Sequence, residues 1–82
     1  MAKNRIFESD FKDIIYELSN NFGYFTRSEY ASKQSIINVL VHSPQQETEV
    51  IKYLKAWFYL SKRHDQIDGR IYLTFQEGCQ EA

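Results

Sequence analysis

The segment Ile36–Val41 constrains the fold of this chain most strongly, because four of its six residues are β-branched. On a helix these side chains would surround the axis, and no single face could be buried. On a strand, Ile37, Val39 and Val41 share one face that can pack against a hydrophobic core. The segment favours a strand, and therefore an α+β fold, while a helix over residues 35–42 is the alternative.

An amphipathic helix is predicted over residues 10–22. Ser9 can accept a hydrogen bond from an early helical N–H as the N-cap, and Asp10 and Asp13 favour the positive end of the helix dipole. Gly23 is expected to end the helix in a left-handed conformation. Apolar residues recur behind the cap at spacings of three and four and form one stripe, namely Phe11, Ile14, Ile15, Leu18 and Phe22.

A second helix is predicted from Pro44 to about residue 60. Ser43 supplies an N-cap hydroxyl, Pro44 suits the first helical position, and Gln46 stands at the capping-box position. The residues expected on its buried face are Val50, Ile51, Leu54, Trp57, Phe58 and Ser61. Its aromatic content exceeds what one buried stripe needs, so one or two rings are expected at the surface.

A β-hairpin is predicted over residues 62–75. Asp68 and Gly69 form the favoured pair for a two-residue type I′ turn, because both positions need positive φ. On the far side of this turn, residues 71–75 have the β-rich composition of a strand. The near side, residues 62–67, is polar and can be a strand only at an edge or in an exposed ribbon.

Residues 24–33 support two predictions. Thr26 and Glu29 have capping-box spacing, which predicts a short helix over residues 27–33 before the strand at Ile36. Alternatively, residues 24–30 form a strand that pairs with Ile36–Val41. No internal repeat is evident in the sequence.

With the short helix, the chain resembles a winged-helix domain. The resemblance rests on residues 23–31 (GYFTRSEYA), 50–60 (VIKYLKAWFYL) and 68–74 (DGRIYLT). It implies a helix-rich α+β fold of three helices with a C-terminal β-hairpin, in which the third helix enters the major groove of DNA. The chain departs from this family at residues 35–43, which look like a strand between the second and third helices. The alternative architecture is an α-β-β-α-β two-layer sandwich with a three-stranded sheet.

Length and composition predict one small domain over residues 1–82, with an ordered core over about 6–76 and a flexible tail over 77–82. The 82 residues allow only one domain, and a content of 43% hydrophobic and 16% aromatic residues suits a folded protein. No run approaches the roughly 20 apolar residues of a membrane span, and the first ten residues lack the apolar stretch of a signal peptide. We therefore expect a cytoplasmic protein without a membrane partner.

The residue inventory predicts a protein that is not an enzyme. The two histidines, His42 and His64, are separated by the second predicted helix, and Cys79 is the only cysteine. No His-Glu-x-x-His, Cys-x-x-Cys or glycine-rich phosphate motif is present, and no nucleophile, base and oxyanion set can be assembled. We expect no metal and no cofactor.

One predicted function is DNA binding and transcription regulation through the helix over 44–62 and the hairpin over 62–75. Basic residues are in excess between Val50 and Arg70, although the net charge of the chain is −1 and any DNA binder of this kind would need dimerisation. The predicted DNA-binding residues are Gln45, Gln46, Thr48, Lys52, Lys55, Lys62, Arg63 and Arg70. This interpretation requires the basic residues to share one continuous face.

The alternative function is a protein-interaction module, such as a small adaptor or a phage-type inhibitor. Tyr, Trp and Phe dominate the hot spots of protein interfaces, and a near-neutral chain suits a protein partner. The predicted protein-binding residues are Tyr53, Trp57, Tyr59 and Tyr72. An exposed aromatic surface would also suit a homodimer.

Overall fold

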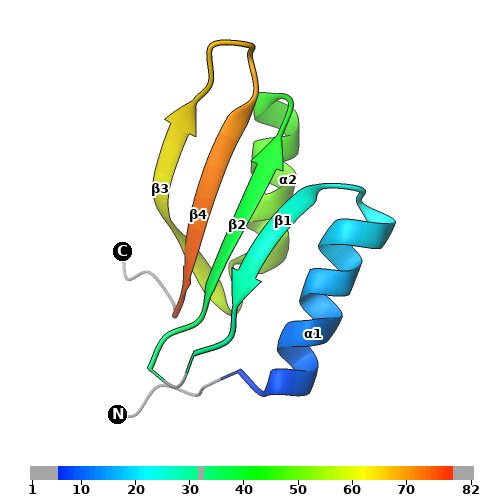
Figure 1. The fold of residues 1–82 in the computed structure, drawn as a ribbon, viewed down its shortest axis with the longest axis vertical. Coiled ribbons are helices and arrows are strands. Elements are labelled where there is room, and N and C mark those ends of the chain that lie inside the picture. The colour runs from blue at the N-terminus through cyan, green and yellow to red at the C-terminus, as the bar shows by residue number, and fades with distance from the viewer. Residues whose placement is uncertain (1–5, 32, 79–82) are drawn as a thin grey trace.

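The computed structural model describes residues 6–31 and 33–78, which form an α-β-β-α-β-β chain around one antiparallel sheet (Figure 1). The strands lie side by side in the order β1-β2-β4-β3. In sequence order the elements are α1 (Glu8–Tyr16), the π-helical turn η1 (Glu17–Asn21), β1 (Phe25–Glu29), β2 (Ile36–Val41), α2 (Pro44–Leu54), β3 (Phe58–Asp65) and β4 (Ile71–Glu77).

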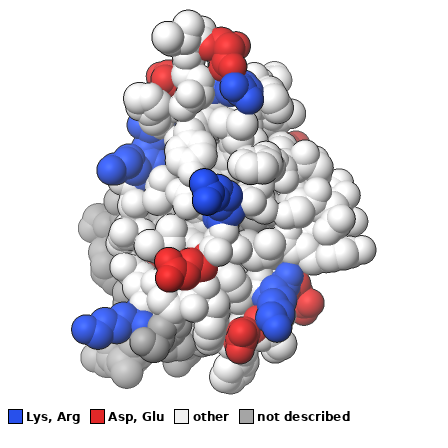
Figure 2. Space-filling model, viewed as in Figure 1, with Lys and Arg blue, Asp and Glu red and all other residues white. Residues whose placement is uncertain are grey.

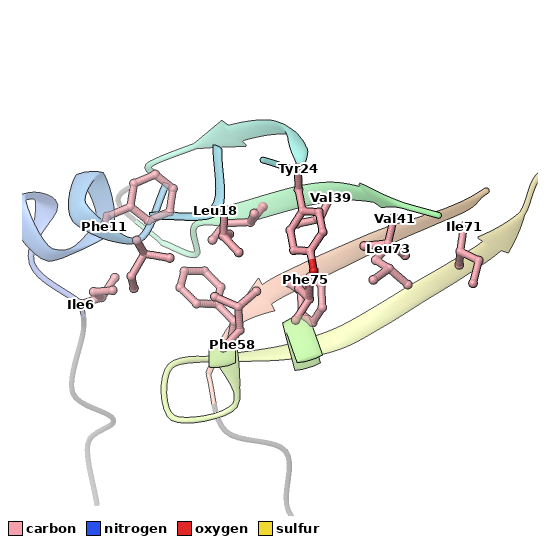
Figure 3. Close-up of a cluster of buried hydrophobic side chains, with 14 residues drawn as sticks. Ile6, Phe11, Leu18, Tyr24, Val39, Val41, Phe58, Ile71, Leu73 and Phe75 are labelled. Carbon is pink, nitrogen blue, oxygen red and sulfur yellow. The ribbon is translucent and has the colours of Figure 1, made fainter. Parts of the chain in front are cut away.

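Both helices pack on one face of the sheet, and the core lies between these two layers. Figure 3 shows the buried side chains of this core against the sheet. The expected strand face of Ile37, Val39 and Val41 is confirmed, since all three side chains are fully buried. The other core residues come from every element of the domain, namely Ile6, Phe11, Ile14, Leu18, Tyr24, Val50, Leu54, Phe58, Ile71, Leu73 and Phe75.

The first helix is confirmed, but its predicted cap is wrong. α1 begins at Glu8 after Phe7, and no side chain caps it, so Ser9 is already inside the first turn. The helix continues through η1, where the Phe22 amide donates to the Glu17 carbonyl five residues earlier at 2.9 Å. Gly23 then reverses the chain with φ of +78°, as predicted.

The second helix begins as predicted and ends six residues early. The Ser43 hydroxyl accepts a hydrogen bond from the Gln46 amide at 3.2 Å, while the Gln46 side chain accepts from the His42 amide at 2.7 Å. The helix ends at Leu54, and Phe58 starts a strand opposite Glu77. Aromatic and apolar residues at 58–60 fit a strand as well as a helix, and pairing with β4 decides between the two.

The C-terminal hairpin is confirmed and is longer than predicted, because it spans β3 and β4 with a bulge between Leu60 and Lys62. The predicted two-residue type I′ turn is wrong. The connection comprises residues 66–70, and within it only Gly69 has positive φ. The polar strand lies at the edge of the sheet as expected, where Ser61 to Asp65 are all exposed.

The helix predicted over 27–33 is wrong, and the strand alternative is confirmed, since β1 pairs antiparallel with β2. The Thr26 hydroxyl, expected to cap that helix, instead bonds the Ser19 hydroxyl of η1 at 2.7 Å. The α+β class therefore holds, but the described chain has two helices and a four-stranded sheet rather than three helices and a hairpin. The predicted two-layer sandwich lacked one strand, β3.

The tail predicted to start at residue 77 is wrong at its first two positions. Glu77 belongs to β4 and is 7% exposed, and Gly78 is also buried. The Glu77 carboxylate accepts hydrogen bonds from the Ile6 amide at 2.9 Å and the Ser35 amide at 3.0 Å. It thereby ties the N-terminal segment and the β1–β2 loop to the end of the sheet. Residues 79–82, with Cys79, lie outside the described residues.

The structure contains a repeat that the sequence did not reveal, because α1-β1-β2 and α2-β3-β4 follow the same order. Core positions recur 36 residues apart: Ile14 and Val50, Leu18 and Leu54, Ile37 and Leu73. The two central strands β2 and β4 are antiparallel neighbours, with one edge strand outside each. This arrangement has approximate two-fold symmetry about an axis through the middle of the sheet.

Candidate functional site on the open face of the sheet

The sheet face opposite the helices is the candidate functional site, and we call it the open face. In Figure 1 the molecule is viewed from this side, with α2 behind the sheet. The strand registers arrange its side chains in three rows that run across β1, β2, β4 and β3. The first row is Phe25, Leu40, Tyr72 and His64; the second is Arg27, Asn38, Thr74 and Lys62; the third is Glu29, Ile36, Gln76 and Tyr59.

The first row, which we call the aromatic row, is the most apolar. Phe25 is 64% exposed although it stands in a strand, and Leu40 and Tyr72 beside it are half-buried. Neighbouring strands lie about 4.8 Å apart, so adjacent side chains in the row can touch one another. The row offers a contact strip of ring and aliphatic surface that no helix covers.

The second row, which we call the charged row, has a polar centre and a cation at each end. The Thr74 hydroxyl donates to the Asn38 side-chain oxygen at 2.9 Å, so a hydrogen bond joins the two central side chains. Among the described residues, no carboxylate lies within ion-pair distance of Arg27 or Lys62. Both cations are exposed, one on each edge strand.

The third row is of mixed character. The Tyr59 hydroxyl donates to the Gln76 side-chain oxygen at 2.7 Å, and Ile36 is half-buried beside them. Glu29 is exposed at the β1 edge. In Figure 2 the described residues of this face are mostly uncharged, and their blue and red groups are separate and form no continuous basic patch.

The predicted DNA-binding residues do not gather on one face. Lys62 lies on the open face, whereas Arg63, the next residue, points to the helical side and pairs with Glu47 of α2 at 2.7 Å and with Asp65 at 3.0 Å. Arg70 pairs with Asp68 in the hairpin loop at 2.6 Å. These carboxylates raise the pKa values of both arginines and already occupy their guanidinium groups.

The remaining predicted DNA contacts belong to α2, on the helical side of the sheet. The side chain of Gln46 and the hydroxyl of Thr48 make hydrogen bonds within the first turn, with the His42 amide and the Pro44 carbonyl. Gln45, Lys52 and Lys55 are exposed on this helix. The sheet therefore separates them from Lys62.

The predicted protein-binding residues are also divided between the two sides. Tyr59 and Tyr72 lie on the open face. Tyr53 and Trp57 lie on the helical side, where their rings meet edge to face at 6.1 Å and Tyr53 also meets Phe22 at 5.5 Å. Burial, together with the Glu17 and Asp13 carboxylates, raises the pKa of Tyr53.

Sequence reasoning missed the β1 half of the open face. Phe25, Arg27 and Leu40 become neighbours of Tyr72 only when residues 25–29 form a strand in this register. The signal that could have found them is the hairpin alternative itself, because pairing residues 24–30 with the alternating strand 36–41 places residues of the first strand beside those of the second. The capping-box pattern at Thr26 and Glu29 competed with this alternative.

Among residues 6–31 and 33–78, no group of three or more His, Cys, Asp or Glu side chains is placed to hold a metal ion. No helix in this described part is both long and apolar enough to cross a membrane. Comparison of the chain with protein-family models, curated proteins and solved structures finds no match.

Proposed function

We propose that this protein is a non-enzymatic protein-binding module whose contact surface is the open face of its sheet. The observation that carries this proposal is that both helices cover one face of the sheet and leave the aromatic row on the other face exposed. A small domain would be expected to use its apolar residues for its own core, so ring surface left uncovered on a sheet face suggests an external partner.

The chemistry of the open face suits a protein surface. Phe25, Tyr59 and Tyr72 supply rigid rings, which are enriched among the residues that dominate binding energy at protein interfaces. In the polar pairs Asn38–Thr74 and Tyr59–Gln76 the hydroxyl donates to the amide oxygen, which leaves the side-chain NH2 groups of Asn38 and Gln76 as donors for a partner's carbonyl or carboxylate oxygens. The face is mixed in polarity and carries few charges among its three rows, and depletion of charge is common at interface centres.

The DNA-binding function stays a prediction with less support. The residues predicted to contact DNA are divided between the two sides of the sheet. Two of them, Arg63 and Arg70, form ion pairs with carboxylates of the same chain. Nonspecific DNA affinity grows with the number of phosphates that a single surface can neutralise. On the open face only Arg27 and Lys62 could do so.

The test of the proposed function compares matched aromatic variants on the two sides of the molecule. Phe25→Ala with Tyr72→Ala removes the aromatic row, and Trp57→Ala removes a ring that is 40% exposed on the helical side. A partner captured from lysate and then purified should bind the wild type and the Trp57 variant with similar Kd. Its affinity for the double variant should fall by at least about 1 kcal/mol, or fivefold. A partner affected only by Trp57→Ala would place the site on the helical side.

A further inference from the structure

From the pattern of charges on the open face we propose that the partner is an acidic protein segment, with two carboxylates that meet Arg27 and Lys62 and uncharged side chains between them. This inference rests on the proposed function and names the chemistry of the partner. It starts from the charged row, in which these two cations stand at opposite ends and lack carboxylate partners among the described residues.

The geometry of the row sets the spacing. Arg27 lies on β1 and Lys62 on β3, so three inter-strand steps separate them, or about 14 Å. The side chains between them, Asn38 and Thr74, are neutral and bonded to each other. A segment lying across the strands would therefore meet a cation, a neutral stretch beside the aromatic row, and a second cation.

The contrast with the other arginines supports the availability of this pair. Arg63 and Arg70 are held by Glu47, Asp65 and Asp68. Arg27 and Lys62 have no such carboxylates although the chain contains more acidic than basic residues. The open face carries these two cations and the single carboxylate of Glu29, so it is net positive on a chain whose total charge is −1. Unpaired cations around a ring surface favour carboxylates on the partner.

The same pattern argues against a second copy of this chain as the occupant. Two open faces can stack about a two-fold axis that runs along the strands or across them. When the axis passes through the charged row, the first places Arg27 opposite Lys62 of the second copy, and the second places each cation opposite its own equivalent. The twist of about 30° between stacked sheets moves the ends of the row by only about 4 Å, which leaves like charges close together. Like charges at such contacts disfavour the complex.

The test uses a library of random dodecapeptides displayed on phage and selected on the immobilised protein. Selected peptides should be enriched in acidic residues four positions apart with uncharged residues between, because four residues of extended chain span about 13 Å. A synthetic peptide of the consensus should lose at least about tenfold in affinity on Arg27→Ala with Lys62→Ala. It should be unaffected by the matched control, Lys52→Ala with Lys55→Ala, which removes two exposed cations from the helical side.

The outcomes separate this inference from the proposed function. Peptides that depend on Phe25 and Tyr72 but lack acidic enrichment, or that bind the Arg27 and Lys62 variant normally, would overturn the acidic partner and leave the proposed function standing. Peptides whose binding depends neither on Phe25 and Tyr72 nor on Arg27 and Lys62 would overturn both the acidic partner and the proposed function. A concentration-dependent dimer in sedimentation equilibrium that is lost on Phe25→Ala would identify a second copy instead. Binding of a 20-nucleotide oligo-dT that requires Arg27 and Lys62 would identify a nucleic acid, and either result would overturn the inference.

Discussion

The two halves of the molecule, α1-β1-β2 and α2-β3-β4, share their topology and core spacing but differ in what they present outside the core. In the first half, the helix runs on through η1 and the edge strand has five residues; in the second, the helix stops at Leu54 and the edge strand has eight. The first hairpin loop is tied down by Tyr30 and Ser35, whereas the second ends in fully exposed Ile67. Equivalent core positions are therefore compatible with very different surfaces.

The two halves also differ in how their charged side chains are paired. In the second half, the edge strand and its loop hold Arg63 and Arg70 in internal ion pairs, while Arg27 on the first edge strand has no carboxylate partner among the described residues. The position 36 residues after Val41 is Glu77, so a buried valine in one half corresponds to a buried carboxylate in the other. The two halves therefore share a pattern of core residues but differ in their ion pairs and in where they place a buried carboxylate.

The largest expected effect is a loss of stability on truncating equivalent core residues, and it tests whether the two halves contribute equally to the core. Leu18 and Leu54 are equivalent positions and both are 0% exposed. Leu18→Ala and Leu54→Ala should each lower the free energy of unfolding by about 3 kcal/mol, because each leaves a cavity in the same core. Urea denaturation followed by circular dichroism measures both values. A difference of more than about 2 kcal/mol between them would break the equivalence of the halves.

A smaller effect is expected at Glu77, where the halves differ. Glu77→Ala leaves the buried amides of Ile6 and Ser35 without their acceptor, so we expect a loss of about 2 kcal/mol in the free energy of unfolding. Glu77→Gln should lose less, since its carbonyl oxygen still accepts one bond. Exposed Glu29→Ala is the control in the same denaturation experiment. Equal stabilities of the Glu77 and Glu29 alanine variants would show that the carboxylate does not hold the chain ends together.

The next comparison concerns the starts of the two helices. Ser43 caps α2 through its hydroxyl, whereas Ser9 lies inside the first turn of α1, which no side chain caps. Ser43→Ala should lower the free energy of unfolding by about 1 kcal/mol, and Ser9→Ala should change it by less than about 0.5 kcal/mol. Thermal unfolding of the two variants measures this difference. The reverse order would restore Ser9 as the cap of the first helix.

The elements with explicit local signals could be predicted from the sequence, and those defined by pairing could not. Ser43, Gly23 and the alternation in Ile36–Val41 each act within a few residues, and all three predictions hold. The strand at Phe58 was predicted as helix because its apolar spacing continues that of α2, and only pairing with β4 shows otherwise. The turn at Gly69 was correctly placed, but its length depends on where that pairing ends.

The candidate site was partly predictable for the same reason. Tyr59, Tyr72 and Lys62 were identified by residue type, and all three lie on the open face. They lie on the same face as Phe25 and Arg27 because of the register of three strand pairs. Register follows from the packing of the whole sheet, so composition and local spacing do not determine it. Arg63 shows the limit clearly, because it follows Lys62 directly and points to the opposite side.

The smallest expected effect is on the pH dependence of stability, at two tyrosines on the helical side that interact with residues of the other half. Burial, followed by a hydrogen bond to Glu49, raises the pKa of Tyr24, and burial with the Glu17 and Asp13 carboxylates raises the pKa of Tyr53. A raised pKa in the folded state favours the neutral phenol, so its contribution is complete below the unfolded value near 10 and is lost as the pH rises through the folded value. Tyr24→Phe and Tyr53→Phe should therefore each make stability fall less steeply above pH 10 than in the wild type. Absorbance at about 295 nm follows phenolate formation, whose onset should lie above that of free tyrosine for both rings.

Because Glu49 belongs to α2, and Glu17 and Asp13 to η1 and α1, the pKa of each tyrosine depends on carboxylates of the opposite half. Tyr24→Phe should accordingly lose the contribution that depends on Glu49, and Glu49→Gln should lower the pKa of Tyr24 while leaving that of Tyr53 in place.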